Sequence, residues 1–88
     1  MNLTGEQLSE VRDMAGLFFS IEEIAENIET DIEEIEMEMA LKQGEFYKAY
    51  RYGWLEAEIK LRKSIQQAAE NGSNPAQQML LNFQKNAR

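Results

Sequence analysis

Carboxylates are concentrated in the segment ETDIEEIEMEM, residues 29–39, which holds six acidic residues and no basic one. At this density, carboxylates can bind a metal ion or act as a general acid and base. A calcium loop, however, arranges its oxygen ligands around a glycine turn, and a di-iron helical bundle pairs glutamate with histidine. This segment has no glycine and the chain has no histidine. We therefore expect no metal site.

Catalysis by a carboxylate pair requires burial that shifts a pKa. The apolar residues of the segment recur at helical spacing, which places Glu33 and Glu36 on the solvent side of a helix. The chain also has no cysteine, no glycine-rich phosphate loop and no nucleophile elbow. The sequence thus favours a protein that is not an enzyme and needs no cofactor.

A second segment, EFYKAYRYGW at residues 45–54, mixes basic with aromatic residues, a pattern that can bind nucleic acid through charge and stacking. Helical spacing divides the segment, because Phe46, Tyr50 and Trp54 share one side and form a buried stripe. The other side, the outer half of the helix, combines bases with large apolar groups: Lys48, Arg51, Tyr52, Leu55, Ile59, Arg62 and Lys63.

The bases of that outer half, together with Lys42, are candidate DNA contacts. Tyr52, Leu55 and Ile59 are spaced three and four residues apart, so they form a strip and a candidate oligomer or partner interface. Packing against another part of the chain and direct contact with DNA are the alternatives for this surface.

Helices account for the whole pattern, since residues suited to strands never alternate for long. Three helix starts carry a capping box, in which two side chains satisfy free backbone N–H groups. The boxes are Thr4 with Gln7, Ser20 with Glu23, and Thr30 with Glu33. The second helix is short and the third follows after about two residues, which is the layout of a helix-turn-helix.

The apolar faces of these three helices predict the core: Leu8, Val11, either Met14 or Ala15, and Leu17, then Ile21, Ile24, Ala25 and Ile28, then Ile32, Ile35 and Met39. Glu36 and Glu38 are expected to point outward. From about Glu45 to Asn71 the spacing predicts one long helix. Its buried stripe continues through Ala57, Leu61, Ile65 and Ala68.

A turn ends the long helix, because Gly72 suits the left-handed position after a helix and Asn74-Pro75 suits an N-cap and a first helical residue. The short connection implies that a last helix returns as a helical hairpin. This helix carries Ala76, Met79, Leu80 and Phe83 on one side. Gly44 and Gly53 leave room for a bend before or within the long helix.

The sequence therefore predicts an all-α protein: a helix-turn-helix-like acidic lobe over residues 1–43, then a long helix and a returning helix over residues 44–88, together one compact domain.

Charge is unevenly distributed along the chain. Residues 1–44 hold twelve acids and two bases, a net charge of −10, and residues 45–88 hold four acids and seven bases, a net charge of +3, which together give −7. Such a split suggests that the halves face different partners, or each other in neighbouring subunits. No apolar run predicts a membrane span and no signal peptide is expected, which favours the cytoplasm.

Two blocks of the chain, VRDMAGLFFSIEEIAENI and GWLEAEIKLRKSIQQAAENGSNPAQQMLLNFQK, share features with one protein family. Met14-Ala15-Gly16 leads into a loop, and the next helix opens with acids and the pair Ile24-Ala25. The second block has a long helix, a small-residue turn and a returning helix. Over about residues 8–85 the chain resembles the small subunit of tailed-phage terminases, the DNA-packaging machinery.

The resemblance implies a ring-forming homo-oligomer that binds viral DNA near the packaging start and regulates the large terminase subunit, which is the ATPase and nuclease. In such a protein the helix-turn-helix would contact DNA and the helical hairpin would build the oligomer. The expected location is then the cytoplasm of a bacterial host.

This sequence departs from the family pattern in two ways. Glu29 stands in the tight turn where glycine or a similar small residue is usual, and the third helix carries acids that DNA phosphates repel. Conventional groove reading by residues 33–38 is therefore not expected. DNA contact would instead use the basic outer half of the long helix, or the acidic lobe would dock on Lys48, Arg51, Arg62 and Lys63 of an adjacent copy. The alternative function is a small acidic helical adaptor or regulator that does not bind DNA.

Overall fold

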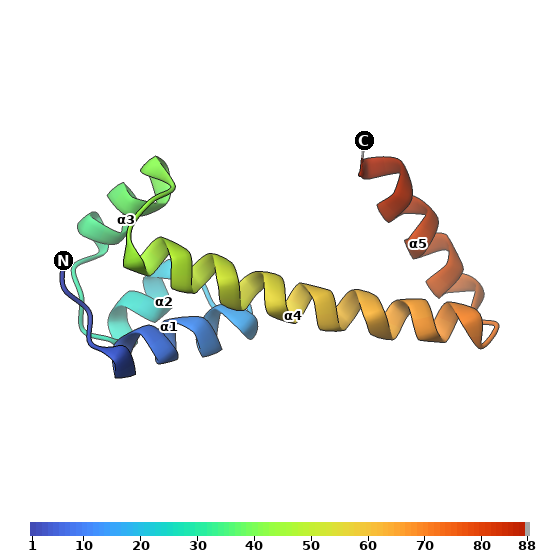
Figure 1. The fold of residues 1–88 in the computed structure, drawn as a ribbon, viewed down its shortest axis with the longest axis horizontal. Coiled ribbons are helices and arrows are strands. Elements are labelled where there is room, and N and C mark those ends of the chain that lie inside the picture. Colours follow the sequence, from blue (N-terminus) through green and yellow to red (C-terminus); the bar gives the residue numbers. More distant parts are fainter. Residues whose placement is uncertain (88) are drawn as a thin grey trace. The chain divides into compact units, whose positions relative to one another are not determined.

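Five α-helices make up the fold of residues 1–87, the part of the chain that this computed structural model describes (Figure 1). They are α1 (Gly5–Gly16), α2 (Ile21–Asn27), α3 (Ile32–Leu41), α4 (Glu45–Glu70) and α5 (Asn74–Asn86). Residues 1–87 contain no strand, so the all-α prediction is confirmed. The capping boxes at Thr4 and Ser20 are both present, and they start α1 and α2.

The chain forms two compact units, Met1–Ala57 and a unit that begins at Glu58, so the division falls inside α4. The sequence had suggested a division between residues 43 and 44, within one compact domain. The observed division lies later because the first half of α4 packs against α1, α2 and α3. Phe46 of α4 is fully buried and belongs to the same core as Ile24 and Ile35.

The core of the first unit is built from the predicted apolar faces. Its buried members are Val11, Ala15, Ile24, Ala25, Ile28, Ile35 and Phe46. Leu17 was expected inside but is exposed, because α1 ends at Gly16 and Leu17 is its C-cap. The next residue, Phe18, takes a positive φ of 64° and packs edge-on against Trp54, with 5.8 Å between ring centres.

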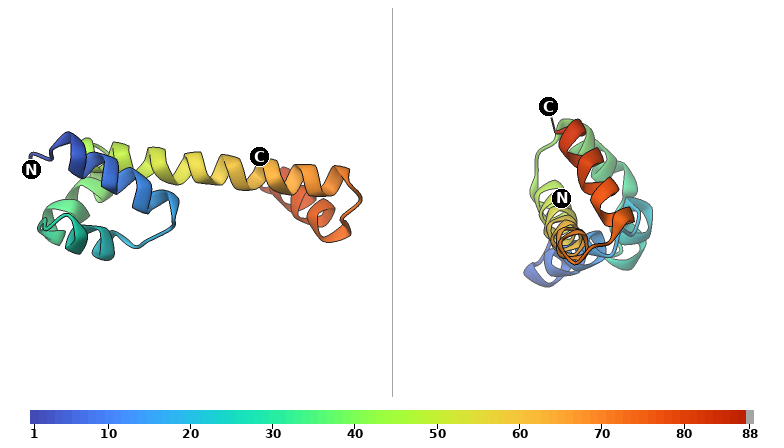
Figure 2. Two further views of the ribbon diagram at one scale, coloured as in Figure 1. Left: turned by 90° about the horizontal axis from the view of Figure 1, so that it is seen from below. Right: turned by 90° about the vertical axis from the view of Figure 1, so that its right-hand side faces the viewer.

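Helix α1 runs beside the first half of α4 (Figures 1 and 2), and two glycines lie where the backbones approach. Gly53 is buried, and a Cβ atom there would lie 2.8 Å from the carbonyl carbon of Arg12 and 2.9 Å from its Cα. A Cβ atom on Gly16 would lie 3.3 Å from the Gly53 carbonyl oxygen. α4 continues through Gly53 as one helix, so this glycine provides a close helix contact, and of the two positions with room for a bend it is Gly44, before α4, that takes a positive φ of 106°.

In the second unit, the turn after α4 contains Gly72 at a φ of 98°, as expected for a left-handed residue. Helix α5 starts one residue earlier than predicted, because the N-cap is Ser73, whose hydroxyl accepts from the Ala76 N–H at 3.3 Å. α5 turns back from the end of α4 (Figure 1), and the Gln77 side-chain amide donates to the Ala69 carbonyl at 3.0 Å.

Leu61 and Met79 were expected on packing faces, but both are exposed. Only small side chains are buried in this unit among the described residues, namely Ala69 of α4 and Ala76 of α5. Ile65, Leu80 and Phe83 are half-buried, while the other larger apolar groups of the unit, Ile59, Leu61, Met79 and Leu81, are exposed.

Candidate functional site

The α2–α3 connection has the local geometry of a helix-turn-helix. Glu29 adopts a φ of 54°, the left-handed conformation in which glycine is usual, and the Thr30 N–H donates to the Ala25 carbonyl at 3.0 Å. Asp31, not Thr30, caps α3, because its carboxylate accepts from the Glu33 N–H at 3.1 Å. Thr30 was thus wrongly predicted as the cap, and a carboxylate at the positive end of the helix dipole takes that role.

The outer face of α3 is the surface that a DNA-reading helix would present to the groove. Ile35 is buried and Ile32 and Met39 are half-buried, which turns the opposite side of the helix to solvent. The exposed residues of that side are Glu33, Glu34, Met37 and Leu41, and Glu36 is exposed beside Ile32. DNA binding depends largely on lysine and arginine side chains that neutralise phosphates and release their counterions. The carboxylates on this face of α3 would instead repel the phosphates.

Glu38 was expected to point outward, but the structure gives it a different position. Its side chain is half-buried, and its Oε1 accepts hydrogen bonds from the backbone N–H groups of Phe46 at 3.1 Å and Tyr47 at 3.4 Å. These are two of the free N–H groups at the start of α4. Glu38 therefore caps the N-terminus of α4 from α3 and joins the two helices.

Replacing Glu38 by alanine is expected to lower the free energy of unfolding by about 1–2 kcal/mol, because two N–H groups near the core lose a charged acceptor. Urea unfolding followed by the fluorescence of Trp54, the single tryptophan, measures the loss. Glu36→Ala is the matched control, since it removes an exposed carboxylate from the same helix, and its effect should stay within about 0.5 kcal/mol. Equal effects of the two substitutions would contradict the capping role.

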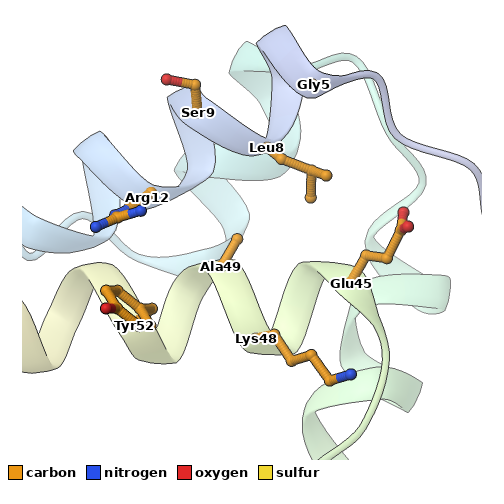
Figure 3. Close-up of a pocket in the computed structure, with 8 residues that line it drawn as sticks. All are labelled: Gly5, Leu8, Ser9, Arg12, Glu45, Lys48, Ala49 and Tyr52. Carbon is orange, nitrogen blue, oxygen red and sulfur yellow. The ribbon is translucent and has the colours of Figure 1, made fainter.

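Among the basic candidates of the first unit, Lys48 lines an open groove of about 500 Å³ between α1 and α4. Leu8 and Ala49 face each other across it, and Lys48 extends its amino group away from α1 (Figure 3). Tyr52 also lines the groove and is 61% exposed. Leu55, on the same side of α4, is 40% exposed. These exposures leave Tyr52 and Leu55 available to a partner.

Arg12 of α1 joins this group, although the sequence did not mark it as a candidate. Its guanidinium lies 4.3 Å from the centre of the Tyr52 ring and donates to the Glu56 carboxylate at 2.6 Å. The hydrogen bond that Arg12 donates to the Glu56 carboxylate raises the pKa of Arg12 above its ordinary value, so this group stays charged. The sequence carried no signal for it, because Arg12 and Tyr52 come together only through the α1–α4 contact.

Arg51 and Lys42 complete the cations of the first unit. The Arg51 guanidinium lies 5.5 Å from the centre of the Trp54 ring, so a cation–π contact orients it while the residue stays exposed. Lys42 is exposed at the C-cap of α3, where it takes a left-handed conformation with a φ of 55°. Lys42 thus belongs to the turn between α3 and α4.

The candidates of the second unit differ in their roles. Arg62 pairs with Glu58 at 3.0 Å and lies 4.1 Å from the centre of the Phe83 ring, so it helps to hold α5 against α4. Lys63 is exposed, and Ile59 is 52% exposed. Arg62 is therefore partly committed to the fold, while Lys63 and Ile59 are available to a partner.

Comparison of the chain with protein-family models, with curated proteins and with solved structures gives no match. Over residues 1–87, no group of three or more acidic side chains is placed to hold a metal ion. None of the helices in that part of the chain is long and apolar enough to cross a membrane. The fold defines a small all-helical protein with an acidic helix-turn-helix lobe.

Proposed function

We propose that this chain is a small-terminase-like subunit of a viral or prophage DNA-packaging apparatus. It acts as a homo-oligomer without catalytic activity in the cytoplasm of a bacterial host, binds DNA and regulates the large terminase subunit. The sequence resemblance supports this role. The helix-turn-helix geometry of α2 and α3, followed directly by a helix with exposed cations, is the structural observation that carries it.

In this proposal α3 does not read the DNA. Lys48 and Arg51 are exposed on the same side of α4, one helical turn apart, and are placed to contact phosphates. Within residues 1–87, Lys48 forms no ion pair shorter than 4 Å, so no such pair must be broken before DNA binds. Binding through so few cations is weak and depends steeply on salt.

The expected result for Lys48→Ala together with Arg51→Ala is weaker DNA binding, with a slope of log K against log salt that is smaller by about 2, because each lost phosphate contact removes about 1. Fluorescence anisotropy of a labelled duplex at several salt concentrations measures the slope. The control is Lys60→Ala, which removes an exposed lysine outside the candidate set. DNA binding that the double substitution leaves unchanged would refute the assignment.

A second candidate function is a protein-interaction adaptor that does not bind DNA. The acidic, partly apolar outer face of α3 favours it, since such a surface repels phosphate and suits a basic protein partner. No DNA binding even at low salt would select this function over the first.

A further inference from the structure

The outer side of α3 is hollowed into an open groove of about 590 Å³. Its apolar lining includes Met37 and Leu41, which are 66% and 60% exposed. Asp31, Glu33 and Glu34 add carboxylates along the groove. The groove therefore has apolar surface for a partner side chain and negative charge beside it.

The core of the first unit does not use the apolar side chains of this groove, Met37 and Leu41. α3 packs into the core through Ile35, with Ile32 and Met39 at its margin, and these residues lie on the opposite side of the helix. Exposed methionine is flexible and polarisable, so it adapts to the side chains of a partner helix. A helix with an apolar residue and a cation on one side would fit such a groove.

The second unit has the complementary charge. Residues 1–57 hold fourteen acids against four bases, a net of −10, and residues 58–88 hold two acids against five bases, a net of +3. On α5, Leu81 is half exposed and Lys85 lies four residues further on, in the last turn. Residues at this spacing share one side of a helix, so α5 presents an apolar group and a cation together.

We propose that the α3 groove of one copy binds α5 of a second copy, with Leu81 against Met37 and Leu41, and Lys85 beside the groove carboxylates. The contact joins two different surfaces, and when it repeats head-to-tail each pair retains one free groove and one free α5. Such a contact propagates into a ring or a filament. The inference rests on the homo-oligomer of the proposed function and is independent of where DNA binds.

Two substitutions test the contact, one on each side of it. Met37→Lys blocks the groove and Leu81→Asp disables α5, and both change exposed residues, so folding is expected to persist. Sedimentation velocity of the wild type is expected to give a mass that rises with concentration and falls with added salt. Each variant alone should stay monomeric, with self-association weakened more than about tenfold.

Mixing the two variants is the decisive measurement. The Met37→Lys copy retains an intact α5 and the Leu81→Asp copy retains an intact groove, so a head-to-tail contact yields a dimer of one copy of each and nothing larger. A mixture that stays monomeric, although both variants show native circular dichroism and Trp54 fluorescence, overturns the proposal. A strictly monomeric wild type at high concentration overturns it as well.

Matched controls separate this contact from general effects of charge. Leu17→Lys places a lysine on an exposed site of the first unit outside the groove, and Met79→Asp places an acid on another side of α5. Both should self-associate as the wild type does, and loss of association in either would argue against the assigned surfaces. DNA binding is measured separately on every variant, so a protein that self-associates but binds no DNA refutes the proposed function and leaves this contact in place.

Discussion

Replacing Phe46 by alanine is expected to lower the free energy of unfolding of the first unit by about 4 kcal/mol, because a large buried aromatic ring is lost and a cavity remains. Phe46 is fully buried in the common core, and its ring stacks on Tyr50 with 6.1 Å between centres. A unit of this size has a total stability of only about 3–8 kcal/mol. Much of the variant should therefore be unfolded at room temperature.

Circular dichroism and Trp54 fluorescence in a urea titration measure this effect. Phe19→Ala makes the same chemical change at an exposed residue and is expected to cost less than about 1 kcal/mol. A similar loss in both variants would mean that the ring of Phe46 is not central to the core.

Replacing Gly53 by alanine is expected to lower the free energy of unfolding by about 2 kcal/mol. Two effects oppose each other. Alanine favours a helix over glycine by about 1 kcal/mol, whereas overpacking costs about 1–3 kcal/mol and sometimes more. The clash should dominate here, because the new methyl group would meet backbone atoms of Arg12, which cannot rotate away as a side chain can.

Gly5→Ala is the matched control, since a Cβ atom on this residue of α1 has no other atom within 4 Å. It should be neutral or stabilise by up to about 1 kcal/mol. Thermal unfolding of the two variants measures the difference. Gly53→Ala as stable as the wild type would mean that α1 and α4 are further apart than the structure places them.

Both predictions concern the contact of α4 with the helix-turn-helix lobe, and this contact also decides the candidate surfaces. It brings Arg12 to Tyr52, turns Lys48 and Arg51 to solvent, and uses Glu38 as the cap of α4. The acids of α3 are therefore not equivalent. Glu38 has a structural role, and the others remain available to a partner.

Local patterns in the sequence predicted most of the helices. Caps at Thr4 and Ser20 and the left-handed Gly72 depend on residues a few positions apart, and all three are confirmed. Most of the core was also predicted, because the spacing of apolar residues along a helix indicates which of its sides is buried. The errors at Leu17, Leu61 and Met79 lie where a helix ends or where too little partner surface covers the predicted face.

By itself, the sequence determined the all-helical class, the acidic helix-turn-helix lobe and the exposed side of α4, since all three follow from periodicity and composition. Only the tertiary structure showed that Gly53 allows α1 and α4 to approach closely. It also decided the cap from Glu38, the position of Arg12 and the division within α4. Each of these depends on two segments far apart in the chain that meet in space. The local sequence of either segment does not predict which residue of the other segment it will contact.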